Sequence, residues 1–234
     1  FSIVASDTYR LNYTMTSSDI EGPIAFTLLV TDTANNASPI YTTVTSGTAV
    51  VFDKTNPTVS TVQASSTTGK YTDDDLTPAN SDVVEILVNF TEAVQVDTAG
   101  GTPTLELETG DTDYTAEYIS TSSNTLLFQY VIDEGILTSP LDYTGTSALA
   151  LNGGTITDLA GNNASLVLAA TGTASSLSGG NIITIDSKDP VLISPQATTD
   201  NASNTAYGKE GNIVTFRIRA DEELNPASIS FTAP

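Results

Sequence analysis

Residues 51–59 read VFDKTNPTV and residues 184–192 read TIDSKDPVL, so one pattern occurs twice in a chain of 234 residues. In each copy an apolar strand end is followed by an aspartate, two spacers, an asparagine or aspartate, a proline and a new strand. Proline has no backbone N–H and is excluded from the interior of sheets. The pattern is therefore typical of a junction between two β-domains, and the chain contains it twice.

Two further pairs of segments repeat at a similar distance. Residues 84–94 (VEILVNFTEAV) match residues 214–224 (VTFRIRADEEL), because both alternate apolar and polar side chains and then end in an acidic turn. Residues 31–36 (TDTANN) match residues 157–162 (TDLAGN). A period of about 130 residues indicates repeated domains of this size.

The repeats predict the tail of one module (1–53), one complete module (54–187) and the start of a third (188–234). No segment has a sustained helical period. In the complete module, runs of apolar and β-branched residues between Gly, Pro, Asn and Asp clusters predict seven strands, near 58–65, 82–90, 104–108, 115–120, 124–132, 147–151 and 181–186. This spacing is typical of an all-β sandwich.

Four segments of the complete module resemble bacterial immunoglobulin-like repeats of large surface proteins and adhesins. They are residues 90–94 (FTEAV), 101–107 (GTPTLEL), 141–149 (LDYTGTSAL) and 151–162 (LNGGTITDLAGN). The resemblance implies tandem immunoglobulin-like Greek-key β-sandwiches outside the cell, in a stalk or adhesive role, often with calcium at the joints. The first module departs from the family at Asn35, where glycine is usual, but asparagine also tolerates the left-handed conformation.

The charge of the chain limits its partners. Seven Lys and Arg residues stand against 28 Asp and Glu residues, which gives a net charge of −21. Such a chain repels nucleic acid and anionic membranes and attracts cations. No apolar run is long enough to span a bilayer, and the first ten residues do not read as a signal peptide, so we expect a segment of a longer extracellular protein.

The predicted topology brings distant acidic residues to the pole of the module where the incoming linker arrives. The second strand ends there at Glu92 and the penultimate strand at Asp158, so both should lie near the linker. We predict a Ca²⁺ site at each junction, because Ca²⁺ is held by six to eight oxygen ligands. The candidate ligands are Asp53, Asn56, Glu92, Asp158 and Asn162 at the first junction, and Asp186, Asp189 and Glu222 at the second.

A plainer interpretation applies to each of these residues taken alone. Asp and Asn are common at strand ends because their side chains make local hydrogen bonds in turns. The run Asp73-Asp74-Asp75 is a further candidate for a metal site, but a short charge run is usually a solvated loop.

Catalysis has little chemical basis in this sequence. The chain holds no His and no Cys, so imidazole bases, thiol nucleophiles and disulfides are absent. We therefore expect a structural or adhesive stalk repeat and not an enzyme. Its expected partners are neighbouring modules of the same chain and other copies placed laterally. The alternatives are a subunit of an extracellular filament, sheath or surface layer, and a ligand- or carbohydrate-binding accessory module of a secreted enzyme.

Overall fold

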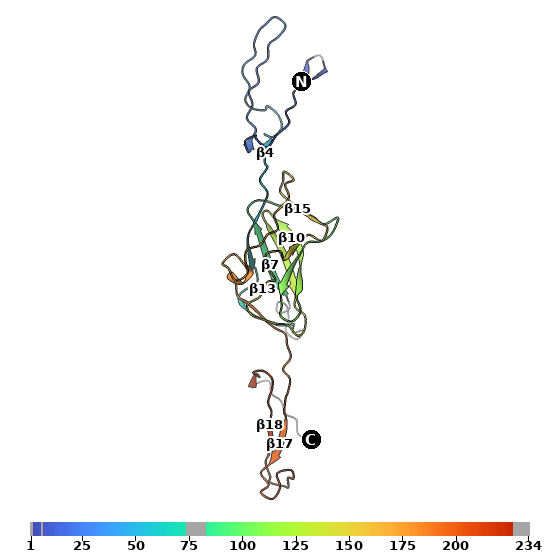
Figure 1. The fold of residues 1–234 in the computed structure, drawn as a ribbon, viewed down its shortest axis with the longest axis vertical. Helices are drawn as coiled ribbons and strands as arrows, with labels where there is room; N and C mark the ends of the chain where they lie inside the picture. Colours follow the sequence, from blue (N-terminus) through green and yellow to red (C-terminus); the bar gives the residue numbers. More distant parts are fainter. Residues whose placement is uncertain (1, 6, 74–82, 227–234) are drawn as a thin grey trace.

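The computed structural model describes residues 2–5, 7–73 and 83–226. These residues form 18 β-strands and one short 3-10 helix, η1 (Leu177–Gly179), so the predicted all-β class is confirmed. None of the helical structure in these ranges is long and apolar enough to cross a membrane. Figure 1 shows a central body with a thinner extension at each end of the long axis.

The central body is built on one large antiparallel sheet. Its strands follow the order β13-β9-β10-β11-β7-β5, and β14 pairs with β9 beside β13. The strands are β5 (Val59–Ala64), β7 (Val83–Phe90), β9 (Thr104–Glu108), β10 (Tyr114–Ser122), β11 (Thr125–Val131), β13 (Asp142–Tyr143) and β14 (Leu149–Ala150).

Two smaller sheets complete the central body. In the first, β16 (Ile183–Asp186) lies between β12 (Leu137–Thr138) and β6 (Gly69–Tyr71) and runs parallel to β6. In the second, β8 (Gln95–Asp97) pairs with β15 (Thr155–Thr157). Each of the seven predicted strands overlaps an observed one. The strands missing from the prediction are only two or three residues long, too short to show an alternating pattern.

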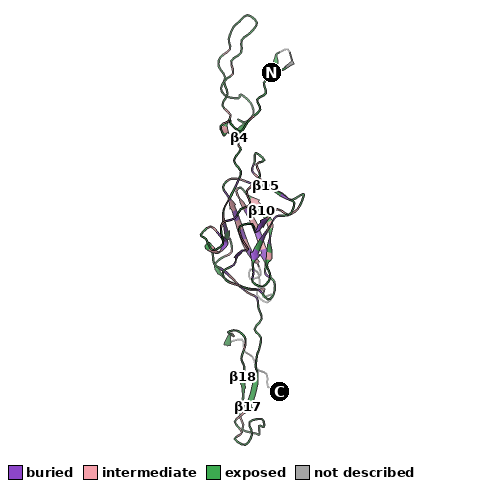
Figure 2. Ribbon diagram, viewed as in Figure 1, coloured by how far each residue is buried: buried purple, intermediate pink, exposed green. Residues whose placement is uncertain are grey.

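The hydrophobic core lies inside the central body. In β7 every second side chain from Val84 to Phe90 is buried, and β11 buries Leu126, Phe128 and Tyr130 in the same way. Among the described residues, the hydrophobic core extends from Val62 to Ile185. Figure 2 shows the buried residues gathered in this body, with the extensions almost entirely exposed.

Two glycine-rich turns meet at the end of the pair β8–β15 where Asp97 lies opposite Thr155. A Cβ atom on Gly101 would lie 1.7 Å from the backbone oxygen of Asn152, and one on Gly154 would lie 2.4 Å from the oxygen of Gly101. These backbones can approach so closely only because neither residue has a side chain. The turns therefore fix how β8 and β15, which adjoin them, lie against each other.

The two extensions hold short strands, in which Tyr9, Val51 and Val214 are exposed. The upstream extension contains β1 (Ser2–Ala5), β2 (Thr8–Arg10), β3 (Gly22–Pro23) and β4 (Val51–Phe52). The downstream extension contains the pair β17 (Gln196–Thr199) and β18 (Val214–Arg217).

Local structure recurs where the sequence repeats. In the central body Thr58 donates its N–H to the Thr91 hydroxyl, and the Thr91 N–H donates back to the Thr58 carbonyl. In the downstream extension Val191 donates to the Asp221 carboxylate at 2.8 Å, and the Asp221 N–H donates back to the Val191 carbonyl. The segments after both Asx-x-x-Asx-Pro junctions therefore pair with the same partner positions.

Candidate metal centre

The pairing of β8 with β15 brings Glu92 and Asp158 together. Thr157 lies directly opposite Gln95 in this antiparallel pair. Asp158 follows Thr157, and Glu92 lies three residues before Gln95, so both carboxylates fall at the same end of the pair. The contact between the glycine-rich turns at the other end of β8 and β15 sets this pairing.

Asp158 is held by its own turn. Its Oδ1 accepts the N–H groups of Ala160 and Asn162, both at 2.8 Å, and its Oδ2 accepts the Asn162 side-chain amide at 2.7 Å. Gly161 has a φ of 93°, the left-handed conformation that closes the turn. Burial acts to raise the pKa of Asp158, but the hydrogen bonds from Asn162, Ala160 and Gly161 outweigh it and hold the pKa below its ordinary value.

Asp53 reaches the same place from the linker. The Asp53 backbone carbonyl accepts the Asn162 amide at 3.3 Å, and its carboxylate accepts the Thr55 N–H at 3.0 Å. Further along the linker, the Pro57 carbonyl accepts the N–H of Ser165 at 2.8 Å. The linker is therefore fastened to the loop that follows Asp158.

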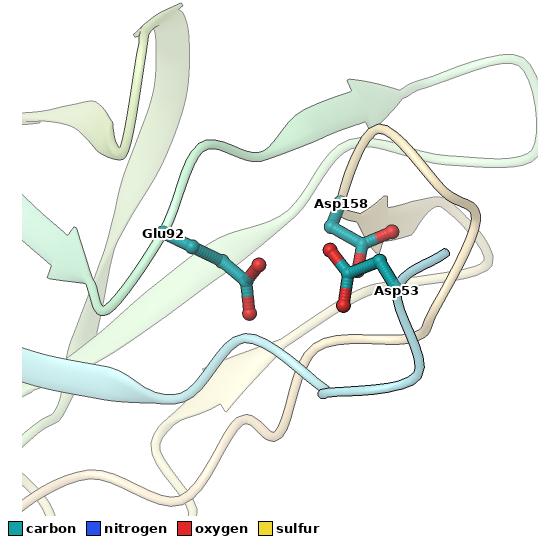
Figure 3. Close-up of side chains that lie close together, drawn as sticks. All are labelled: Asp53, Glu92 and Asp158. Carbon is teal, nitrogen blue, oxygen red and sulfur yellow. The ribbon is translucent and has the colours of Figure 1, made fainter. Parts of the chain in front are cut away.

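The three carboxylates converge at the upstream pole of the central body. One carboxylate oxygen from each of Asp53, Glu92 and Asp158 lies within 4.8 Å of the other two. Figure 3 shows Asp53 and Asp158 side by side, with the Glu92 carboxylate directed towards them. Asp158 is buried and the other two are half-buried. Neither of the ion pairs found among the described residues involves any of the three.

The electrostatics of the cluster are unfavourable when all three groups are charged. Desolvation raises the pKa of Glu92, and the negative charges of Asp53, Asp158 and Glu21 raise it further. A bound cation would remove this repulsion. The donor set is composed of oxygen alone, which suits Ca²⁺ better than the nitrogen- and sulfur-binding transition metals.

The two predicted amide ligands at this junction lie in different positions. Asn162 directs its amide nitrogen towards Asp158 and Asp53, so in this structure it positions those residues. Asn56 is exposed on the linker.

The second junction is arranged differently. Asp186 forms an ion pair with Lys70, and the nearby Glu222 carboxylate contributes to raising the pKa of that lysine, after the Asp186 hydrogen bond. Asp189 is exposed. Within the described ranges, no second group of three carboxylates meets as closely as the first. By the repeat, the counterpart of Asp158 at this junction would fall beyond residue 234.

Glu21 takes part in the first junction but is not among the residues predicted from sequence. Its carboxylate accepts the Lys54 N–H and the Thr55 hydroxyl, both at 2.8 Å. Gly22 lies opposite Phe52 in the pair β3–β4, and Thr138 lies opposite Ile185 in the pair β12–β16. Phe52 and Ile185 are equivalent positions of the repeat, so the residue equivalent to Glu21 is Leu137. Because leucine is not acidic, comparison of the repeats does not reveal an acid at this position. Of the acidic run Asp73-Asp74-Asp75, only Asp73 lies within the described residues; Asp74 and Asp75 lie outside them.

Comparison of the chain with protein-family models, with curated proteins and with solved structures finds no significant match.

Proposed function

We propose that the chain is a structural or adhesive extracellular stalk segment made of tandem immunoglobulin-like modules, with Ca²⁺ bound at the joint. The observation that carries the proposal is the meeting of Asp53, Glu92 and Asp158. Asp53 belongs to the linker and the other two belong to the central body, and their carboxylate oxygens lie within 4.8 Å of one another. A cation held there joins the linker to the body.

The effect of the ion follows from the charges. Without it, the linker brings one carboxylate towards two others, and their repulsion opposes a fixed joint. With it, the carboxylates become ligands, and backbone carbonyls and water complete the six to eight oxygens that Ca²⁺ takes. Extracellular modules bind Ca²⁺ with dissociation constants of about 10⁻⁴ to 10⁻³ M. The joint is therefore stiff at millimolar Ca²⁺ and flexible without it.

The recurrence of local structure supports the tandem arrangement. The turn at Asp32 has the same hydrogen bonds as the turn at Asp158: Asp32 Oδ1 accepts the N–H groups of Ala34 and Asn36, and Oδ2 accepts the Asn36 amide. The residue with positive φ in this turn is Asn35, at 64°. Two such turns, one in the upstream extension and one in the central body, are what repeated modules would have.

The test is a Ca²⁺ titration of the whole chain, read by thermal unfolding, with Asp53→Asn beside the native protein. At Ca²⁺ about a hundredfold above the dissociation constant, we expect the melting temperature to rise by about 5 to 10 °C. Asp53→Asn should lose most of this rise. The matched control is Asp113→Asn, an exposed aspartate in the turn before β10, which should keep it. An equal response in all three proteins, or none up to about 10 mM, would contradict Ca²⁺ binding at this joint.

A further inference from the structure

Both edge strands of the large sheet in the central body contact one segment, residues 170–181, which we call the strap. The sheet ends at β13 on one side and at β5 on the other. The strap contains η1, which contacts both of these strands. An uncovered sheet edge presents unpaired N–H and C=O groups to which a strand of another chain can pair. The strap therefore lies where such pairing would begin.

Backbone groups at the free edge of β5 are bonded to the strap. The Val62 N–H donates to the Ser175 carbonyl at 3.0 Å. The Asn181 side-chain amide donates to the Ala64 carbonyl at 3.3 Å. The strap thus takes the place that a further strand would occupy beside β5.

The carboxylate of Asp142, in β13, holds the strap in this position. Its Oδ2 accepts the Gly172 N–H at 3.0 Å, the Ser176 hydroxyl at 3.0 Å and the Ser178 hydroxyl at 2.6 Å. Asp142 and Ser176 are buried, and Asp142 is not part of the metal centre. Hydrogen bonds to a charged group are stronger than those between neutral groups. Because three donors of the strap meet one charged oxygen, the hold on the strap depends on this carboxylate.

The strap contributes only one apolar side chain to the core. Leu177 is fully buried, whereas Thr171, Thr173 and Ala174 are exposed. The hydrophobic stabilisation of a segment grows with the apolar area that it buries. With a single apolar anchor, the strap relies on its hydrogen bonds to Asp142 and β5.

The upstream extension has alanine at the position of Asp142. The two modules can be aligned here by a backbone hydrogen bond that both contain, from Ile24 to Val50 and from Leu141 to Ile183. The residue that follows Ile24 is Ala25, just as Asp142 follows Leu141.

The segment between the repeated turn and the next junction is also shorter in the upstream extension. It covers residues 163–183 in the central body but only residues 37–50 in the extension. The aspartate and the longer segment are present together in one module and absent together from the other. This pattern supports a joint role for Asp142 and the strap.

We propose that Asp142 keeps the strap closed over β5, and that the closed strap prevents the central body from pairing sideways with a second copy of the chain. The pairing that it blocks is an antiparallel contact between two β5 edges, because a two-fold axis brings identical edges together. The inference goes beyond the proposed structural role and does not depend on calcium, so all of its tests are made in EDTA.

Hydrogen exchange tests the hold of Asp142 on the strap. In Asp142→Ala chains we expect the Val62 amide to exchange about tenfold faster or more, because its bond to Ser175 is lost when the strap opens. Amides of β7, in the interior of the sheet, should stay within about twofold of their native rates. Equal acceleration at Val62 and in β7 would overturn the proposal, since Asp142 would then stabilise the whole body and not the strap.

Ser178→Ala is a milder variant that removes one donor and leaves the carboxylate in place. We expect the Val62 amide to exchange about two- to tenfold faster in this variant, again with β7 unchanged. It tests the same hold if Asp142→Ala chains do not fold. An unchanged Val62 rate in Ser178→Ala would contradict the role given to the strap donors.

Sedimentation at several concentrations tests what the strap covers. We expect Asp142→Ala chains to self-associate about tenfold more tightly than native chains, or more. The matched control is Asp113→Ala, which removes the same charge from an exposed position and should behave as the native chain does.

A disulfide can fasten the strap independently of Asp142. A Cβ atom on Gly180 would lie 3.6 Å from the Cβ atom of Gln63, a separation that a disulfide spans, and the native chain has no cysteine. Gln63→Cys and Gly180→Cys are therefore added to Asp142→Ala. The oxidised protein should associate no more than the native chain, and reduction should restore the association. Association that persists with the disulfide closed, or no association after reduction, would overturn the claim that the strap keeps β5 from pairing.

Discussion

Glu92 is the residue at which the repulsion between the clustered carboxylates is most evident. Partial burial and three neighbouring carboxylates all disfavour its charged form and raise its pKa. An acid whose pKa is higher in the folded than in the unfolded state binds protons more tightly when folded. It therefore lowers the stability of the fold at neutral pH, and this loss is recovered as the pH falls through the raised pKa.

Glu92→Gln should for this reason act in opposite directions with and without calcium. In EDTA at pH 7 it removes the repulsion, and we expect the melting temperature to rise by about 2 °C. In millimolar Ca²⁺ it removes a ligand, and the rise caused by the ion should shrink. Thermal unfolding in both buffers, repeated near pH 4 where the native and variant proteins should converge in EDTA, checks the sign. A variant less stable than the native protein in EDTA would contradict the electrostatic account.

Sequence alone predicts some residues of the candidate site and misses others. Asp53, Glu92 and Asp158 are found because each ends a strand or begins a turn in a repeated segment, and a sandwich brings those strand ends to one pole. Glu21 is missed because its counterpart is Leu137, so nothing repeats. The position of the Asn162 amide nitrogen follows from the hydrogen bonds of its turn, which residue spacing does not specify.

At the scale of elements, the pair β8–β15 is what the site depends on. Both strands are three residues long and lie outside the seven predicted ones. Longer strands such as β7 and β11 are predictable because three or four alternating side chains of each face the core. Short strands have no such pattern, and their pairing is set here by the contact between two glycine-rich turns, which depends on tertiary structure.

Gly101→Ala tests the role of this contact. The added methyl group would lie 1.7 Å from the Asn152 oxygen, so the turns must separate. We expect a loss of about 1 to 3 kcal/mol in the free energy of unfolding. We also expect a smaller Ca²⁺ response, because Glu92 and Asp158 adjoin β8 and β15 and are brought together by the pairing of these strands. Urea unfolding and Ca²⁺ titration measure the two effects. Gly145→Ala is the control, since nothing lies within 4 Å of the added group. An equal loss in both variants would contradict a role of the turn contact in pairing β8 with β15.

At the scale of the whole molecule, the chain is one packed body between two extensions that pack little. The core between Val62 and Ile185 provides the stability, while Leu11, Tyr13, Val51 and Val214 of the extensions are exposed. The joint at Asp53 is therefore where a small binding energy has the largest effect on shape. A ligand that adds about 2.7 kcal/mol, at a hundred times its dissociation constant, is enough to select one arrangement of the joint.

The most direct test is the distance across this joint. Spin labels on Ser46→Cys, in the upstream extension, and Thr115→Cys, in β10, report the spread of distances by pulsed electron resonance, and the native chain holds no other cysteine. We expect a broad distribution in EDTA that narrows in millimolar Ca²⁺ and stays broad in Asp53→Asn. A distribution that is equally broad or equally narrow in all three samples would contradict the claim that a cation at Asp53, Glu92 and Asp158 fixes the joint.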